Sequence, residues 1–241
     1  MKKKLYELLV DKGICETEQA ARAEIMAGNV FIKNIRVDKA GTLIDTAADI
    51  TLKTKEHPYV SRGGLKLEKA LKEFSIDCTD IIAMDIGSSA GGFTDCMLQS
   101  GAKQVYAVDV GTGELNWKLR NDKRVTVMEG TNARFLTAES VGRKFDLITC
   151  DVSFISLKLI LPVIKDLLNG GGRAVVLIKP QFGAEREQVE TGGIVRDSAV
   201  HKEVIDKVKK YASDNKLTVS RVTESPIKGM KGNTEFLALI E

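Results

Sequence analysis

Apolar residues in the first 54 positions follow a helical period at first and a strand period afterwards. Leu5, Leu8 and Leu9 share one face of a predicted helix, which Gly13 ends. Thr17 can cap a second helix, which is predicted to end at the glycine in position 28. Short strands are predicted at 30–32, 35–37 and 50–52. The pattern therefore predicts a small α+β unit at 1–54.

A proline and two adjacent glycines interrupt this pattern in the run HPYVSRGG, which starts at His57. Proline and glycine at this density are typical of a break between structural elements. The sequence therefore predicts a linker at 55–64, followed by a helix from Leu65 to Phe74.

From position 81 onward, apolar runs alternate with helical stretches, which predicts a parallel sheet covered by helices. The apolar runs lie at 81–86, 104–110, 125–128, 145–150 and 173–178. A helix at 198–213 precedes two closing strands at 217–222 and 236–240, joined through the glycine-containing segment 226–232. The second region, 65–241, is therefore predicted to be an α/β domain with a doubly wound, Rossmann-like sheet.

Composition narrows the class of protein without identifying it. Of 241 residues, 43% are hydrophobic and 29% charged, an ordinary globular balance. The net charge of +3, from 36 basic and 33 acidic residues, is only a weak indication of a nucleic-acid partner. No run approaches the roughly 18 apolar residues of a membrane helix, and no continuous apolar region follows the opening MKKK. We therefore expect a cytoplasmic protein without a membrane segment.

The four cysteines, Cys15, Cys78, Cys96 and Cys150, are far apart in the sequence. They form no C-x-x-C pair and have no neighbouring histidines, so a zinc site is not expected. Reduced thiols in an intracellular protein are the simplest interpretation.

The strongest local signal is the run DIGSSAGGF, which starts at Asp85, follows a predicted strand and opens a helix. Glycines at such a turn let the backbone pass close to a ligand at the carboxyl edge of the sheet. Asp109 lies at the end of the next strand, where an acid can accept both hydroxyls of a ribose. The two features predict an adenosine-containing cofactor, and a tight turn beside a solvated acid is the alternative. The predicted cofactor-binding residues are Asp85, Gly87, Ser88, Gly91, Gly92, Phe93, Asp109, Asn132 and Asp151.

The glycine pattern also discriminates between cofactors. Dinucleotide enzymes use G-x-G-x-x-G to hold a pyrophosphate, and Ser89 replaces the second glycine of that fingerprint. A nicotinamide cofactor is therefore disfavoured, and a cofactor without phosphates fits better. The run resembles the first motif of class I methyltransferases, which implies S-adenosylmethionine.

Charged residues follow two of the predicted central strands. Asp151 and Lys179 come at the carboxyl ends of the fourth and fifth strands, where α/β folds place their sites. Glu235 stands at the head of the last strand, and Lys66 lies in the helix before the first. Each residue alone is also compatible with an ordinary surface position. Cys150 is next to Asp151, but strand alternation points it away, so a core position is expected rather than a thiol nucleophile.

Taken together, the order of Lys66, Asp151, Lys179 and Glu235 resembles the catalytic tetrad of FtsJ-like ribose methyltransferases. The first unit resembles an S4 RNA-binding domain. The runs SRGGLKL, CDVSFIS, IKPQF and GNTEF are similar to those of the hemolysin A (TlyA) family, which joins these two modules. The resemblance implies 2′-O-methylation of cytidines in ribosomal RNA of the small or large subunit.

This resemblance also implies roles for the four residues. Lys179 is the expected base for the ribose hydroxyl, because burial and a second ammonium from Lys66 favour a neutral amine. Asp151 would orient Lys179, and Glu235 would hold Lys66 or the ribose. Much of the rate is expected from the positioning of the hydroxyl and the methyl group. No metal is required.

The expected RNA-binding residues are basic ones in the first unit and beside the linker, namely Lys4, Arg22, Lys33, Arg36 and Arg62. Charge alone is equally compatible with a solvated surface. The segment 181–196 is either a mobile lid or a long connection. Two further hypotheses remain at this point, a non-catalytic RNA-binding assembly factor and a cytolysin, as the family name suggests.

Overall fold

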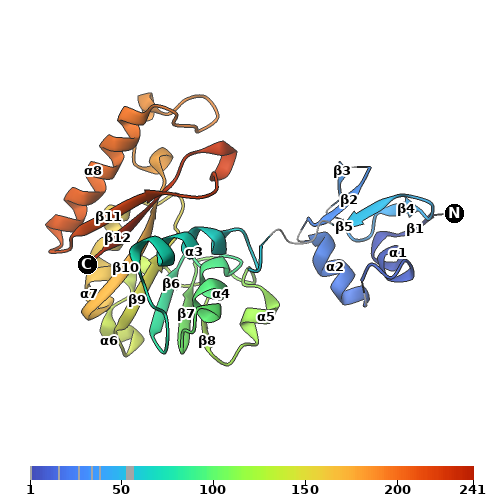
Figure 1. The fold of residues 1–241 in the computed structure, drawn as a ribbon, viewed down its shortest axis with the longest axis horizontal. Coiled ribbons are helices and arrows are strands. Elements are labelled where there is room, and N and C mark those ends of the chain that lie inside the picture. The colour runs from blue at the N-terminus through green and yellow to red at the C-terminus, as the bar shows by residue number, and fades with distance from the viewer. Residues whose placement is uncertain (1, 16, 27, 34, 38, 53–56) are drawn as a thin grey trace. The chain divides into compact units, whose positions relative to one another are not determined.

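The computed structural model describes residues 2–15, 17–26, 28–33, 35–37, 39–52 and 57–241. The chain divides into two compact units, Met1–Pro58 and Tyr59–Glu241 (Figure 1). The predicted boundary between 54 and 55 lies outside the described residues.

The first unit is a small α+β unit with its own core. Its elements are β1 (Lys2–Lys4), α1 (Leu5–Asp11), α2 (Glu18–Met26), β2 (Val30–Ile32), β3 (Ile35–Arg36), β4 (Leu43–Asp45) and β5 (Ile50–Leu52). Leu5, Leu9 and Ile25 are fully buried where the two helices meet the strands. β2 pairs antiparallel with β3 and β5, and β1 pairs antiparallel with β4. The sequence pattern did not indicate β1 or β4. β1 consists of three lysines, and β4 is too short to show an alternation of apolar and polar residues.

The second unit is built on a seven-stranded sheet with the order β11-β12-β10-β9-β6-β7-β8. Its strands are β6 (Ile82–Ile86), β7 (Gln104–Val108), β8 (Val125–Met128), β9 (Phe145–Cys150), β10 (Leu168–Ile178), β11 (Val219–Glu224) and β12 (Phe236–Ile240). The first five run parallel, and β12 is antiparallel to both β10 and β11. This topology confirms the predicted α/β class and Rossmann-like sheet.

Helices cover both faces of this sheet (Figure 1). One face packs against α3 (Gly63–Phe74), α4 (Gly92–Gln99) and α5 (Trp117–Arg120). The other packs against α7 (Leu157–Leu167) and α8 (Ser198–Asp214), with the short α6 (Ala138–Val141) beside them. Consecutive residues at the end of β10 face opposite cores and are all buried, which explains the continuous apolar run in the sequence.

The structure differs from the prediction at residues 59–64, which belong to the second unit rather than to a linker. Tyr59 is buried and its hydroxyl donates a hydrogen bond to Glu68 (2.8 Å), and burial raises its pKa. α3 begins at Gly63, two residues earlier than predicted. A Cβ on Gly92 would lie 2.9 Å from the nitrogen of Gly64, so these glycines allow α3 and α4 to pack closely. In the sequence these glycines predicted a break between elements, whereas in the structure they let α3 and α4 approach each other closely.

Two strands also differ in their bounds. β7 ends at Val108, two residues before the predicted end. β10 begins at Leu168 rather than at the predicted 173, because Leu168 already pairs with Phe145 of β9. The pairing then shifts register at a β-bulge and resumes at Arg173. None of the helices in the described part of the chain combines the length and the apolarity needed to cross a membrane.

Candidate active site

The glycine-rich turn after β6 is held in place by Asp85. One carboxylate oxygen accepts hydrogen bonds from the backbone N–H and the hydroxyl of Thr94, at 2.9 and 2.7 Å. The other accepts from the hydroxyl of Thr149, at 2.9 Å. Gly87 has a φ of +81°, and a Cβ there would lie 2.5 Å from the carbonyl oxygen of Asp151. Asp85 therefore ties α4 to two strands while the turn passes close to the end of β9.

Burial raises the pKa of Asp85 to about 6, from an ordinary value of 3.8, against the lowering effect of its threonine hydrogen bonds. The folded protein therefore holds this proton at pH values where the unfolded chain has lost it. Protonated Asp85 therefore contributes to the free energy of unfolding below about pH 4, and this contribution is lost as the pH rises to about 6. Asparagine does not titrate, so the Asp85→Asn variant does not lose stability in this way. Its free energy of unfolding, relative to wild type, is expected to increase by about 2 kcal/mol between about pH 4 and pH 7.

Denaturant titrations of both proteins at several pH values measure this difference. Asp122→Asn is a matched control, because the Arg124 side chain lowers the pKa of the half-buried Asp122. The control is expected to show the opposite trend with pH. Parallel stability curves for wild type and Asp85→Asn would contradict the assignment.

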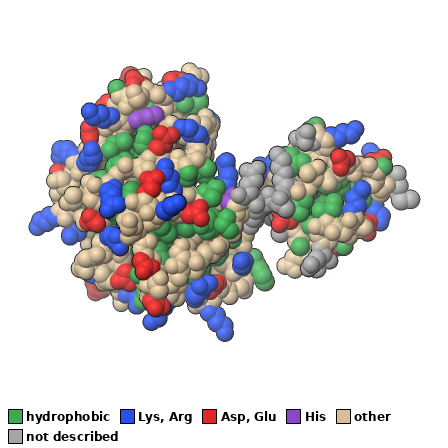
Figure 2. Space-filling model, in the orientation of Figure 1, with side chains coloured by type: hydrophobic (Ala, Val, Ile, Leu, Met, Phe, Trp, Pro, Cys, Tyr) green, Lys and Arg blue, Asp and Glu red, His purple; other side chains and the backbone are tan. Residues whose placement is uncertain are grey.

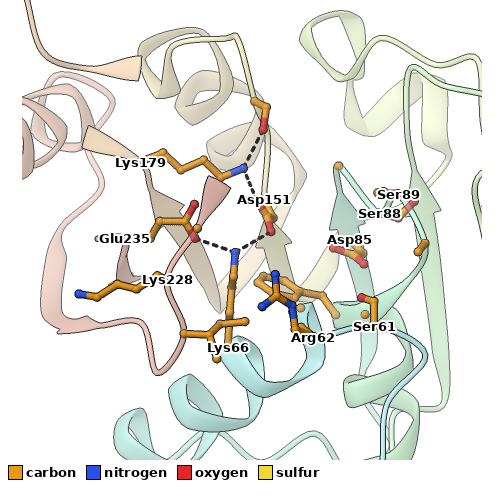
Figure 3. Close-up of a pocket in the computed structure, with 18 of the residues that line it drawn as sticks. Ser61, Arg62, Lys66, Asp85, Ser88, Ser89, Asp151, Lys179, Lys228 and Glu235 are labelled. Carbon is orange, nitrogen blue, oxygen red and sulfur yellow. Dashed lines mark hydrogen bonds and ion pairs between the residues drawn. The ribbon is translucent and has the colours of Figure 1, made fainter. Parts of the chain in front are cut away.

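Two cavities open at the carboxyl edge of the sheet, one on each side of this turn. The first, of about 400 Å³, is lined by residues of α3, the glycine turn, and the ends of β9, β10 and β12 (Figure 3). The second, of about 540 Å³, is lined by Asp109 and Asn132 among others. Gly87, Ser89 and Asp151 line both cavities. Their volumes lie in the range of small-molecule sites, and together they can hold an elongated ligand.

Asp109 is fixed at the second cavity by the turn itself. One carboxylate oxygen accepts from the N–H of Ser89 and the other from the N–H of Gly111, both at 2.8 Å. Asn132 caps a 3-10 helix by accepting from the N–H of Arg134, at 3.1 Å. The structure thus places both predicted residues on one cavity, with Asp109 half-exposed to it.

The first cavity offers a site for an anionic group. Ser88 is 6% exposed, and its hydroxyl has no hydrogen-bond partner among the described residues. Ser61, Arg62 and Gly63, at the start of α3, line the same cavity as Gly92 at the start of α4. Helix N-termini favour negative charge. A carboxylate beside the Ser88 hydroxyl therefore fits this end of the cavity.

Not every predicted cofactor residue lines a cavity. Gly91 has a φ of +93°, and a Cβ there would lie 2.8 Å from Leu115, so it faces the core under α5. Phe93 is 3% exposed and packs in the core, with one edge at the first cavity. Packing in the core therefore explains the glycine at 91 and the phenylalanine at 93 as well as contact with a cofactor does.

The four charged residues singled out in the sequence meet in the first cavity (Figure 3). Lys179 Nζ lies 2.6 Å from one carboxylate oxygen of Asp151, and Lys66 Nζ lies 3.7 Å from the other. Lys66 also donates to Glu235, at 2.7 Å. Two lysine and two acidic side chains therefore face one another in one mostly buried cluster.

Ser153 is a member of this group that the sequence analysis did not assign. Its hydroxyl accepts a hydrogen bond from Lys179, at 2.8 Å. The Lys179 side chain is 10% exposed, and its nitrogen points toward Asp151 in the cavity (Figure 3). An amine held in this way can exchange a proton with a hydroxyl bound in the cavity. In the sequence, Ser153 was marked only by its place in the run CDVSFIS, two residues after Asp151.

Cys150 is fully buried in the core between the sheet and α7. Burial raises the pKa of its thiol to about 12, and the neighbouring Asp151 carboxylate adds to this effect. A thiol nucleophile would need to be exposed and ionised. The structure thus supports the expected core position.

The expected RNA-binding residues fall in both units. Lys4, Arg22, Lys33 and Arg36 belong to the first unit, whereas Arg62 lies at the start of α3 and lines the first cavity. The Arg22 guanidinium lies 3.5 Å from the centre of the Tyr6 ring. Basic and acidic side chains are interspersed on the face of the second unit shown in Figure 2, so charge alone does not mark an RNA surface.

The segment 181–196 is attached to its surroundings at several points. Glu185 pairs with Lys207 (2.8 Å) and Gln188 donates to Glu203 (2.8 Å), both partners being on α8. The N–H of Val195 donates to the buried side chain of Asn233, at 2.9 Å. No group of three or more His, Cys, Asp or Glu side chains suited to a metal ion occurs in the described part of the chain.

A doubly wound sheet with an antiparallel β12, and a glycine turn after its first strand, is the fold of class I methyltransferases. The magnesium protoporphyrin IX methyltransferase of Synechocystis PCC 6803, solved with bound S-adenosylmethionine, shares this fold. The two chains are 15% identical with a TM-score of 0.51, over 74% of this chain and 79% of that one. This likeness concerns the fold alone.

The profile of the FtsJ-like methyltransferases matches residues 59–241, and the chain belongs to this family. YqxC of Bacillus subtilis, provisionally named an rRNA methyltransferase, is 51% identical over 98% of this chain and 84% of its own length. The 16S/23S rRNA (cytidine-2′-O)-methyltransferase TlyA of Mycobacterium tuberculosis is 40% identical over 95% and 85%. A solved Streptococcus thermophilus protein, provisionally described as a hemolysin, is 47% identical with a TM-score of 0.77, over 100% and 88%. The family resemblance inferred from the motifs is confirmed.

Proposed function

We propose that this protein transfers a methyl group from S-adenosylmethionine to the 2′-hydroxyl of cytidine ribose in ribosomal RNA. The observation that carries this proposal is the arrangement of Lys66, Asp151, Lys179 and Glu235 in one cavity, beside the glycine turn. The activity for which the TlyA relatives are named supports the choice of substrate. An enzyme acting on ribosomes would work in the cytoplasm.

The two joined cavities suit this cofactor. Asp109 would accept the ribose hydroxyls in the second cavity, near Asn132. Ser88 and the starts of α3 and α4 would hold the carboxylate of the methionine part in the first. When bound, S-adenosylmethionine supplies a methyl group on a positively charged sulfur. The chain's own residues then have to bring a ribose hydroxyl into line with it.

Lys179 is placed to take the proton of that hydroxyl. Its nitrogen would accept the proton, and the Asp151 carboxylate at 2.6 Å would stabilise the ammonium that forms. Lys66 shares the second oxygen of Asp151, and Glu235 compensates the charge of Lys66. Asp151 thus orients the base, while Lys66 and Glu235 keep Asp151 in position. Such fixed charges need no rearrangement during the reaction.

The first unit would supply affinity for RNA as an S4-like domain. Lys4, Arg22, Lys33 and Arg36 are suited to phosphate contacts, which set position rather than sequence preference. Arg62 would continue these contacts at the first cavity. A non-catalytic assembly factor would need this RNA affinity but not the paired charges in the cavity.

Incubating the protein with ribosomal subunits and labelled S-adenosylmethionine tests this proposal. Digestion of the RNA and mass spectrometry are expected to show a ribose-methylated cytidine. A methyl group on a base would reject the proposed mechanism. Absence of both cofactor binding and methyl transfer would favour the assembly factor or the cytolysin.

The cofactor placement makes a separate prediction. Asp109→Ala removes a charged acceptor, which is worth roughly 1.5–3 kcal/mol, so the dissociation constant for S-adenosylmethionine is expected to rise about 10- to 150-fold. Titration calorimetry measures this constant, and NAD serves as the ligand expected not to bind. Asp122→Ala is the control, since Asp122 lines neither cavity. Unchanged affinity in Asp109→Ala would show that the adenosine part lies elsewhere.

A further inference from the structure

The loop between β11 and β12 packs directly on the Glu235 carboxyl group. A Cβ on Gly229 would lie 2.9 Å from Cγ of Glu235 and closer still to its carboxyl carbon and oxygen. Both residues line the first cavity, and the Glu235 side chain, shown in Figure 3, is 3% exposed. The carboxylate is therefore confined between the backbone of Gly229 on one side and Lys66 on the other.

Hydrogen bonds brace this loop at both ends. The N–H of Gly229 donates to the carbonyl of Asn233, at 2.8 Å, and the N–H of Gly232 donates to the carbonyl of Gly229, at 3.1 Å. The N–H of Ser225 donates to the carbonyl of Glu235, also at 2.8 Å. Because these bonds tie the loop to Asn233 and Glu235, just before β12, it cannot move away from Glu235 without breaking them.

The need for glycine at position 229 comes from this contact and not from the backbone. The φ of Gly229 is not positive, so its conformation is open to alanine. The nearest atoms that an added methyl group would meet all belong to Glu235. A side chain at position 229 would therefore act first on the carboxyl group.

We propose that Gly229 is a positioning residue, whose missing side chain lets the loop hold the Glu235 carboxylate against the Lys66 ammonium. The inference rests on the proposed methyl transfer for its kinetic consequence, but not for its structural one. A methyl group at 229 displaces the carboxylate, so Lys66 turns to Asp151 as its remaining partner. Asp151 then shifts relative to Lys179, and the base loses its orientation.

The first test compares Gly229→Ala with wild type in methyl transfer to ribosomal subunits. We expect kcat to fall about 10- to 100-fold, because misplacing a catalytic group by about 1 Å can cost about 100-fold. The KM for the ribosomal subunit and the affinity for S-adenosylmethionine are expected to stay within about twofold of the wild-type values. The variant keeps the contacts that bind both ligands before the reaction. Gly170→Ala is the matched control, since a Cβ there has no neighbour within 4 Å and its φ is also not positive. An unchanged kcat in Gly229→Ala overturns the proposal.

A second variant separates positioning from a general effect on folding. In Glu235→Ala the three side-chain atoms that an added methyl group at position 229 would meet are absent. Adding Gly229→Ala to Glu235→Ala is therefore expected to cause no further loss of kcat, whereas independent effects would multiply. Multiplying effects would overturn the proposal.

Crystal structures give a readout that does not depend on the RNA substrate. In Gly229→Ala the Lys66 and Glu235 side chains are expected to separate beyond about 4 Å, the limit for an ion pair, with the loop unchanged. A Lys66–Glu235 hydrogen bond still near its wild-type 2.7 Å would contradict the proposed role. If the wild-type protein transfers no methyl group but Lys66 and Glu235 separate in the variant, the proposed function is rejected and the positioning role of Gly229 is retained.

Discussion

Replacing Lys179 with methionine is expected to lower the rate of methyl transfer by about 100- to 10,000-fold, the usual contribution of a general base. Methionine keeps most of the volume but cannot accept a proton. Asp151 retains Lys66 as a partner, so the fold is expected to persist. Cofactor affinity should change little, because Lys179 is not among the groups proposed to hold the cofactor, which are Asp109, Ser88 and the starts of α3 and α4. Single-turnover methylation of ribosomal subunits and calorimetry with S-adenosylmethionine measure the two properties separately.

Lys202→Met is a suitable control, because Lys202 is exposed on α8 and lines neither cavity. It is expected to methylate at the wild-type rate. Cys150→Ser is expected to retain activity, since the thiol is buried away from the site. If Lys179→Met is active and Cys150→Ser is inactive, Lys179 is not the base and a mechanism with a cysteine nucleophile is favoured.

Removing residues 1–58 is expected to abolish most methylation of ribosomal RNA while leaving cofactor binding intact. Each unit has its own hydrophobic core, and the described residues that line the two cavities all belong to the second unit. The shortened protein should therefore fold and bind S-adenosylmethionine. For every phosphate group that the first unit neutralises in the intact protein, its removal is expected to reduce the salt slope of RNA binding by about 0.7–0.9.

Titrations of RNA at several salt concentrations, with intact and shortened protein, measure this slope. Arg22→Ala and Arg36→Ala in the intact chain should weaken binding similarly for many RNA sequences, as phosphate-binding side chains do. Equal affinity and equal slope in both proteins would show that the first unit is not the RNA anchor. Loss of cofactor binding on shortening would show that the two units depend on each other.

The cluster of four charges explains why these predictions differ in kind. Lys179 touches the reacting hydroxyl in the proposed mechanism, whereas Lys66 and Glu235 act through Asp151. Changes at Lys66 or Glu235 therefore also leave a buried charge without its partner, which costs stability. Lys179 gives the cleaner test of chemistry, and Gly229 gives the cleaner test of geometry.

The sequence by itself determined the class of fold and singled out four charged residues that meet in the first cavity. A sheet buried on both faces needs continuous apolar strands, and these are visible without a structure. Carboxyl ends of parallel strands share one edge, so Asp85, Asp151 and Lys179 could be expected together. Residues 59–64 show the limit of this reasoning, because glycine in a sequence does not reveal whether it marks flexibility or close packing.

Only the tertiary structure decided which groups are partners. Lys66 and Glu235 are 169 positions apart, and no local pattern records that their side chains meet. The same holds for the hydrogen bond of Ser153 with Lys179 and for the contact of Gly229 with Glu235. Such pairings depend on where the sheet and its loops place each backbone, and sequence periodicity specifies only the face on which a residue lies.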